Sequence, residues 1–231
     1  MADPTPSVEL PNAEYIELKN ISNTTIDLLR WKIKIGNNTV SIPQSYALQP
    51  DSLVVLCSKS QWPLFNLPQK SIGLSFFPAL PNEEGILSLI APDGKTIHGI
   101  EYQSSMHENS LKSNGGWSLE MIDPAKPCSN TNLYSSQHSK GGTPGFMNTV
   151  HKKFKLSDSL YIKQCVALDS KNLLLELNQG VDSIEMSSLR LFNFDTSSIR
   201  ITRAEPLPPL FSTIRLQINP ALQNNFIYTV K

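Results

Sequence analysis

Apolar and polar residues alternate in several short stretches of the chain, and a period of two residues predicts β-strands with one buried and one exposed face. Trp31, Ile33 and Ile35 fall on one side of such a strand, and the two lysines between them fall on the other. The same alternation returns at 214–218. We therefore expect half-buried strands in both halves of the chain.

Two β-hairpins are expected from the order of these stretches. The stretch at 14–20 is separated from the strand at 31–35 by a polar turn at 22–25, which predicts a first hairpin. A second is expected at 85–97, where Asp93-Gly94 supplies the positive φ angles of a tight primed turn. The best alternating apolar positions make up the predicted core of this half: Ile16, Leu18, Trp31, Ile33, Val55, Leu87 and Leu89.

The chain as a whole has the layout of an all-β protein with two domains. Its 231 residues include 17 prolines and 11 glycines that punctuate short apolar runs, and no amphipathic run suits a long helix. We expect two β-sandwiches in tandem, at 1–150 and 156–231, joined by a short, solvated basic link at 151–155. An anion or partner patch is the alternative for that basic cluster. In the second domain, strands are expected at 160–162, 173–177, 188–191, 214–218 and 226–230.

Segments of the first domain, taken in order, resemble a known family. The segments at 14–35, 41–57 and 85–97 together resemble the lamin-tail domain, an immunoglobulin-like sandwich of nuclear lamins and of many bacterial cell-envelope proteins. Three more resemble its bacterial branch: Ala2-Asp3-Pro4-Thr5-Pro6, the segment at 117–124, and Gly141-Gly142-Thr143-Pro144-Gly145 up to Asn148.

The chain departs from the bacterial pattern in two places. An apolar strand usually precedes the Ala-Asp-Pro segment, so Met1 is expected to be an internal residue of a longer protein. Leu133 stands where an aromatic residue is common, which affects the packing of that loop.

The second domain resembles bacterial immunoglobulin-like domains, through Val181-Asp182 and Ser188-Leu189. This resemblance implies two immunoglobulin-like β-sandwiches in tandem, the second incomplete at its carboxyl end, because the stretch at 228–230 is similar to a penultimate strand. A sheet edge would then be left open.

Charge and hydropathy exclude some partners. Twenty basic residues balance twenty acidic ones, so no global field attracts nucleic acid, and nucleic acid is an unlikely partner. No run is long enough to span a bilayer, and no signal peptide is recognised, so an extracellular or cell-envelope location is implied by resemblance alone.

The three cysteines are an odd set, which argues against a closed disulfide framework. Cys57 ends an apolar strand and is interpreted as a small buried hydrophobe. Cys128 follows a proline in a loop and is expected to be the more exposed. A Cys57–Cys128 bridge is the alternative, which an oxidising envelope would favour.

No catalytic constellation is recognised, and no cofactor is expected. The four histidines lack the spacing that places two imidazoles on one metal, and the glycine pairs at 115–116 and 141–142 open no helix, so we interpret the pairs as turns. Asp3, Glu14 and Glu17 are weak candidates for a calcium site, because calcium prefers oxygen ligands. Glu14 and Glu17 point to opposite faces of a strand, which weakens this hypothesis.

Two function classes follow. The first is a non-catalytic structural or protein–protein interaction module of a larger bacterial envelope or secreted protein, with other domains of the same polypeptide or envelope proteins as partners. The alternative is an accessory region, for targeting or substrate binding, of a larger envelope nuclease or hydrolase. Carbohydrate binding is a variant of either, with Trp62, Tyr102 or Tyr134 as stacking platforms, although packing is the simpler role for these aromatics.

Overall fold

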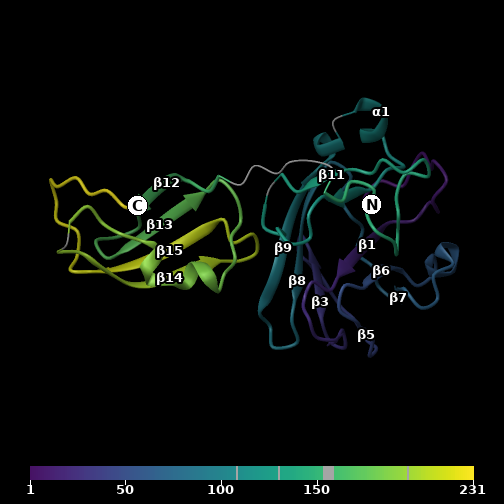
Figure 1. Cartoon of the computed structure of the whole chain (residues 1–231), viewed down its shortest axis with the longest axis horizontal. Helices are drawn as coiled ribbons and strands as arrows, with labels where there is room; N and C mark the ends of the chain where they lie inside the picture. Colours follow the sequence, from purple (N-terminus) through teal and green to yellow (C-terminus); the bar gives the residue numbers. More distant parts are fainter. Residues whose placement is uncertain (108, 130, 153–158, 197) are drawn as a thin grey trace. The chain divides into compact units, whose positions relative to one another are not determined.

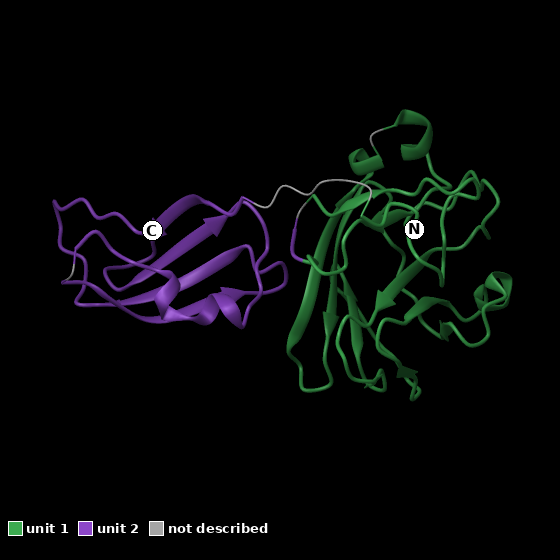
Figure 2. Cartoon of the chain, in the orientation of Figure 1, with its two compact units in different colours: residues 1–127, 131–156 green, residues 128–130, 157–231 purple. Residues whose placement is uncertain are grey.

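The computed structural model of the chain describes residues 1–107, 109–129, 131–152, 159–196 and 198–231. It is built mostly of strands, so the predicted all-β class is confirmed. The chain divides into two compact units, Met1–Pro127 with Thr131–Leu156, and Cys128–Asn130 with Ser157–Lys231 (Figure 2). The predicted basic link extends beyond Lys152 into residues that lie outside the described part of the chain.

The first unit contains two larger sheets (Figure 1). One comprises β4 (Asn38–Ser41), β3 (Lys32–Ile35), β8 (Glu84–Ile90) and β9 (Thr96–Gln103), in that spatial order. The other comprises β1 (Tyr15–Lys19), β6 (Leu53–Ser58) and β7 (Ser71–Leu74), of which β6 and β7 are parallel. Two small pairs, β2 (Ile26–Asp27) with β5 (Ala47–Leu48) and β10 (Leu119–Met121) with β11 (Leu133–Ser135), and three short helices, η1 (Trp62–Phe65), η2 (Ser104–His107) and α1 (Ser110–Ser113), complete the unit.

The main core lies between these two sheets. Strand β3 buries Ile33 and Ile35 and exposes its lysines, as the alternation predicts, and the isoleucines share a cluster with Val54 and Leu56 of β6. Of the predicted core, Ile33 and Val55 are buried, whereas the other members are partly buried. Those partly buried members pack against the main cluster: Ile16, Leu18, Trp31, Leu87 and Leu89.

Strand β6 is buried on both faces. Because side chains alternate along a strand, Val54 and Leu56 enter the main core while Val55 and Cys57 enter a second cluster on the other side of the sheet. Ala13, Tyr15 and Phe65 also belong to that second cluster, in which the rings of Tyr15 and Phe65 lie edge to face at a centroid distance of 5.5 Å. The continuous apolar run at 53–57 thus has the pattern of a strand that is buried on both faces.

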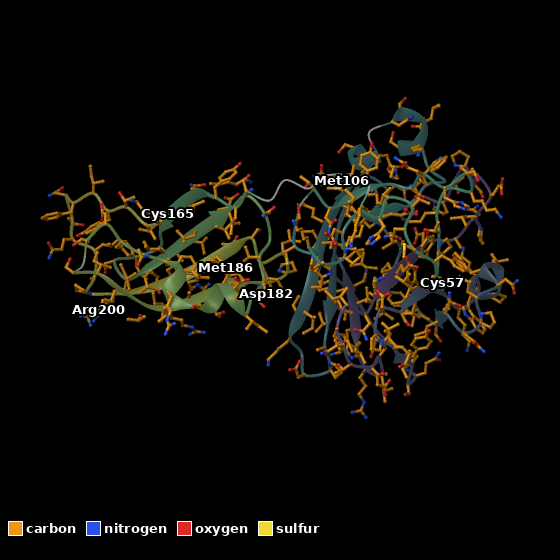
Figure 3. The ribbon with its side chains drawn as sticks, in the orientation of Figure 1. Cys57, Met106, Cys165, Asp182, Met186 and Arg200 are labelled. Carbon is orange, nitrogen blue, oxygen red and sulfur yellow. The ribbon has the colours of Figure 1, made fainter. Side chains whose placement is uncertain are left out.

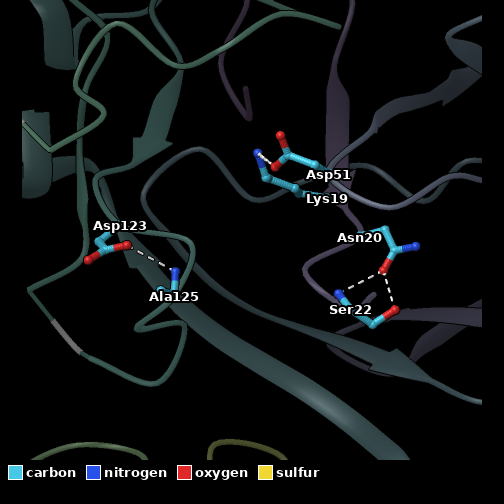
Figure 4. A network of polar contacts seen from close by, with 6 residues as sticks. All are labelled: Lys19, Asn20, Ser22, Asp51, Asp123 and Ala125. Atoms are coloured by element: carbon cyan, nitrogen blue, oxygen red, sulfur yellow. Dashed lines mark hydrogen bonds and ion pairs between the residues drawn. The ribbon is translucent and has the colours of Figure 1, made fainter. Parts of the chain in front are cut away.

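The first predicted hairpin is wrong, because β1 and β3 lie in different sheets. Strand β1 pairs with β6, and β3 pairs with β4 and β8. The chain leaves β1 at Asn20, whose buried side chain donates to the Leu48 carbonyl (2.9 Å) and accepts from the Ser22 amide and hydroxyl (Figure 4). The side-chain amide of Asn20 therefore holds the turn at Ser22 against strand β5, which directs the chain out of the first sheet.

The second predicted hairpin is confirmed, but its turn is of another kind. Strands β8 and β9 are antiparallel, and the Gly94 amide donates to the Ala91 carbonyl (2.9 Å) while the Ala91 amide donates to Lys95 (2.8 Å). Only Gly94 of the Asp93-Gly94 pair has a positive φ, of 90°. A primed two-residue turn needs a different geometry, so this is a longer loop that closes on one left-handed glycine.

The second unit is built on one antiparallel sheet in the order β12 (Ile162–Ala167), β13 (Asn172–Leu177), β15 (Thr213–Asn219) and β14 (Arg200–Leu207). Strand β15 buries Ile214, Leu216 and Ile218 and exposes Arg215 and Gln217, as predicted. The same face of the sheet packs in a cluster with residues from the connecting segments, including Val181, Phe192 and Phe211.

Two strands predicted for this unit are not formed. The stretch at 188–191 contains the 3-10 helix η4 (Leu189–Leu191), which follows the 3-10 helix η3 (Glu185–Ser187). The stretch at 226–230 contributes a single bridge, Val230 with Phe194. Both stretches are short, and a short apolar run fits either a strand or a helical turn.

Among the described residues, none of the helices has the length and apolar character that crossing a membrane requires.

Candidate functional site

Three segments that are distant in sequence form one packed layer in the first unit, which we call the glycine junction: residues 3–6, 115–118 and 141–142. The Gly116 amide donates to the Asp3 carbonyl, and the Ser118 amide donates to the Gly141 carbonyl, both at 2.8 Å. A Cβ atom added at Gly141 would collide with the Gly116 carbonyl oxygen, and one at Gly116 with that of Pro6. Close backbone packing therefore requires glycine at both positions.

Two carboxylates fix the loop that follows the glycine junction. Glu17 of β1 accepts a hydrogen bond from the Gly145 amide (2.6 Å). Glu120 of β10 is buried and accepts from the Thr143 hydroxyl (3.0 Å) and from both the amide and the hydroxyl of Thr149 (2.8 Å each). The loop at 143–149 is thus tied down at both ends by charge-assisted hydrogen bonds.

Burial dominates the electrostatics of this region. It raises the pKa of Glu17 to about 7, with the Glu120 charge adding to the shift and the Gly145 hydrogen bond opposing it. Burial also lowers the pKa of the Met1 amine, which donates to the Tyr15 carbonyl (2.8 Å), to about 5. At pH 7 the Met1 amine is therefore neutral, whereas Glu17 changes its charge as the pH passes through about 7.

The three calcium candidates hold three different backbone amides. Asp3 accepts from Thr5 (3.2 Å), Glu14 accepts from Leu80 (3.1 Å), and Glu17 accepts from Gly145. Burial raises the pKa of Glu14 as well. In the part of the chain that the structure describes, no group of three or more His, Cys, Asp or Glu residues is arranged to hold a metal ion. The calcium site stays a hypothesis from the sequence.

His107 and Ser135 form a contact that the sequence did not indicate. His107 ends η2, and its Nδ1 lies 2.9 Å from the Ser135 hydroxyl on β11. Burial lowers the pKa of His107 to about 4, so the imidazole is neutral at pH 7. A serine–histidine pair can act as nucleophile and base, but Ser135 is only 1% exposed. The geometry is that of a bond that fixes η2 to β11.

The side chain of Lys112 makes two contacts close to the His107–Ser135 pair. Its Nζ donates to the Ser136 carbonyl (2.6 Å) and lies 4.0 Å from the centre of the Trp117 ring. No motif signals either the His107–Ser135 or the Lys112–Trp117 pair, because each joins residues that only the folded chain brings together.

The three aromatic candidates for sugar stacking all have packing contacts. Trp62 is partly buried and donates its indole N–H to the Ser71 hydroxyl (2.7 Å). Tyr102 is buried and donates to the Pro81 carbonyl (2.7 Å). Tyr134 packs against Ile122 and Val150. Packing, the simpler role expected from the sequence, is observed for each.

All three cysteines are free, so the alternative Cys57–Cys128 bridge is not formed. Cys57 lies on β6 (Figure 3). It is buried, as predicted, and burial raises the pKa of its thiol to about 11. Cys128 has intermediate exposure, whereas Cys165 on β12 is exposed, so the more exposed thiol is Cys165.

No known protein-family model matches the chain, and no curated protein matches it in sequence. Its function is therefore inferred from its residues and their geometry.

Proposed function

We propose that the chain is a non-catalytic structural or interaction module of a larger bacterial envelope or secreted protein, made of two immunoglobulin-like domains in series. Its partners are other domains of the same polypeptide or envelope proteins. The main support is the glycine junction. Three segments that resemble the bacterial lamin-tail pattern, near residues 3, 117 and 141, are hydrogen-bonded into one layer.

The use of the reactive side chains is a second support. Glu17 and Glu120 hold the loop at 143–149, and His107 holds η2 on β11. An active site instead aims its acids, bases and nucleophiles at a space that a substrate can enter. Here these groups bind the protein's own backbone and hydroxyls, which suits a rigid scaffold.

The test combines activity and binding assays on the purified chain. We expect no turnover of phosphodiester, ester or glycoside substrates, with or without added calcium, magnesium or zinc. We also expect co-sedimentation with isolated bacterial cell-wall sacculi or retention by immobilised envelope proteins.

Turnover that disappears in His107→Ala or Glu17→Gln would overturn the non-catalytic assignment. Specific binding to a soluble hydrolase or nuclease substrate, without binding to either sacculi or envelope proteins, would favour the accessory region of a larger nuclease or hydrolase instead. Glu101→Gln, at an exposed position of β9, is the matched control for the acidic substitution.

A further inference from the structure

One loop segment crosses the outer face of the β1–β6–β7 sheet, which is the face away from the main core. The strand register places Glu17, Val55 and Ser71 in one row across this face, from β1 over β6 to β7. Gly145 lies at this row, because its amide donates to Glu17 (2.6 Å) and its carbonyl accepts from the Nζ of Lys70, the residue before β7 (3.1 Å). An acid from one edge of the sheet and a base from the other therefore hold the two backbone groups of one glycine.

We call residues 144–147, which include this glycine, the strap. Glu120 fixes both ends of the strap, since one of its carboxylate oxygens accepts from the Thr143 hydroxyl (3.0 Å) and the other from the Thr149 amide (2.8 Å). The side chain of Glu120 is itself buried. The strap is thus a short segment between two fixed ends, and its middle is held at Gly145.

The exposed side chains of the strap contribute little apolar contact. Phe146 is 57% exposed and Met147 is 67% exposed, whereas Pro144 is buried. Gly145 lies against Leu67, because a Cβ atom added to the glycine would be 3.1 Å from a methyl carbon of this leucine. Since polar contacts supply much of the attachment, a change of charge at one of them changes how firmly the strap is held.

The carboxyl group of Glu17 has no cation paired with it. Among the described residues, no ion pair includes either Glu17 or Glu120. The titratable groups that face Glu17 lie on its own strand, on β10 and at the amino end: Tyr15, Lys19, Glu120 and Met1. Lys19 already forms an ion pair of 2.6 Å with Asp51, and burial keeps both Tyr15 and the Met1 amine neutral at pH 7 by shifting the pKa of each. An ionised Glu17 is therefore a buried charge beside a like charge, which is unfavourable.

We propose that the strap is a pH-operated cover, closed over Glu17 while the carboxyl group is protonated and released when the carboxyl group ionises. Release exposes the carboxylate to water, and the proton passes to the solvent. The inference stands on the contacts of the strap and not on the function proposed above.

The pH range follows from the two environments of Glu17. Its pKa is about 7 under the closed strap, where burial raises it, and 4.5 for an unperturbed glutamate. The closed state therefore binds the proton more tightly, so that opening becomes easier as the pH rises from about 4.5 and levels off above about 7.

The first test is amide hydrogen exchange of residues 1–231, resolved to single amides by NMR spectroscopy. The Gly145 amide reports on the strap, and the Val55 amide, which donates to the Lys70 carbonyl (2.8 Å), reports on unfolding of the sheet. After correction for the intrinsic exchange rate, the protection of the Gly145 amide should fall about tenfold or more between pH 5 and pH 8. It should also stay below the protection of the Val55 amide, because local opening requires less free energy than unfolding.

Glu17→Gln is the variant that isolates the carboxyl group. Its side-chain oxygen can still accept from the Gly145 amide, but it cannot ionise, so the protection of this amide should be equal at pH 5 and pH 8. Comparison with the wild type at each pH removes the contributions of the other titrating groups. Glu101→Gln, at an exposed position of β9, should behave as the wild type does. Circular dichroism and thermal unfolding check that both variants fold.

The second test concerns the base that holds the carbonyl side of the strap. Lys70→Met keeps a long apolar chain but removes the donor to the Gly145 carbonyl. The protection of the Gly145 amide should therefore fall about threefold or more at pH 5 and at pH 8 alike, with the pH dependence of the wild type retained. Lys32→Met, at an exposed position of β3, is the matched control.

Three results would overturn the proposal. The first is a Gly145 amide whose protection in the wild type follows that of Glu17→Gln at every pH, or rises with pH. The second is a Gly145 amide as strongly protected as the Val55 amide, since the strap would then open only when the sheet unfolds. The third is a Lys70→Met variant in which the Gly145 amide is as protected as in the wild type.

Discussion

At the scale of single residues, the first unit depends on a few positions where the backbone packs closely or a buried carboxyl group holds a loop. Gly141 and Gly116 allow two backbone segments to touch, and Glu17 and Glu120 hold the loop that follows. These residues combine close packing with buried polar groups, and both features make substitutions costly.

Gly141→Ala should destabilise the first unit more than Gly94→Ala does. The two glycines have nearly the same φ, 91° and 90°, so the backbone strain of a left-handed alanine is about 1–2 kcal/mol at each. A Cβ atom at Gly94 meets nothing within 4 Å, whereas one at Gly141 collides with the Gly116 carbonyl. Chemical denaturation of both variants gives the difference in the free energy of unfolding. Equal losses would mean that the backbone segments of the glycine junction can move apart to accept the Cβ atom without any loss of stability.

Glu17 should make the protein less stable as the pH rises. The pKa of Glu17 is about 7 in the folded chain and 4.5 for an unperturbed glutamate, so the folded state binds more protons between these pH values. The stability that Glu17 contributes at low pH is therefore lost as the pH rises through about 7. The full difference is at most about 3 kcal/mol. Glu17→Gln should therefore flatten the profile and exceed the wild type in stability at pH 8.

Unfolding free energies measured from pH 5 to pH 8 check this prediction. His107 contributes the opposite slope below pH 6.5, because burial lowers its pKa and protonation favours the unfolded state. The difference between Glu17→Gln and wild type removes that contribution, and Glu101→Gln serves as the exposed control. A variant whose profile runs parallel to that of the wild type would contradict the assignment.

At the scale of elements, β6 is the centre of the first unit. Its alternate side chains enter two separate clusters, and it pairs with β1 on one side and β7 on the other. Each substitution in this strand therefore affects either the main core or the cluster around Tyr15.

Leu56→Ala should cost about 2–5 kcal/mol of stability, because the side chain is fully buried and its removal leaves a cavity. Leu111→Ala is the matched control, since Leu111 is 78% exposed and loses little on truncation. Urea titrations of both variants measure the effect. A loss below 1 kcal/mol for Leu56→Ala would contradict the two-sided burial of β6.

Trp31→Ala should lower the free energy of unfolding by less than the loss of a fully buried tryptophan would, because Trp31 is only partly buried.

At the scale of the whole molecule, each unit has its own hydrophobic core. Among the residues that the structure describes, the clusters around Leu56, Tyr15 and Val150 contain only residues of the first unit, and the cluster around Leu175 contains only residues of the second. Separate cores allow separate folding.

Calorimetry of the full chain should therefore show two transitions. Leu56→Ala should lower the temperature of one, and Leu175→Ala that of the other, while a fragment of residues 1–152 should unfold cooperatively alone. A single transition that both variants shift would show that the units unfold as one.

The sequence predicts strands better than it predicts their partners. Alternation located β3 and β15, and a turn signal located the β8–β9 hairpin. Pairing of β1 with β6 brings together residues 40 positions apart, such as Ile16 and Leu56, and it depends on the polar bonds of Asn20, which no local pattern reveals. Pro206 concealed β14, since proline argues against a central strand but fits an edge.

The candidate site was harder to predict than the fold. The sequence indicates Asp3, Glu14 and Glu17 as acidic residues near one another, yet each binds a backbone amide from a different segment. Glu120 is the carboxylate whose charge helps to raise the pKa of Glu17, and it lies about a hundred residues further along the sequence. Close backbone approach at a glycine leaves no trace in composition or periodicity, so the sequence indicates only a turn at each of the two glycine pairs.

The glycine junction also determines how the first unit would respond to mechanical tension. Asp3 is bonded to Gly116, Ser118 is bonded to Gly141, and Glu120 is bonded to Thr149, so a short series of hydrogen bonds connects the start of the unit to its last residues. A pull applied near residue 3 and near residue 150 would load this series first. We expect the strands from β1 to β11 to carry force only after those bonds break, so that the glycine junction would keep tension away from the core.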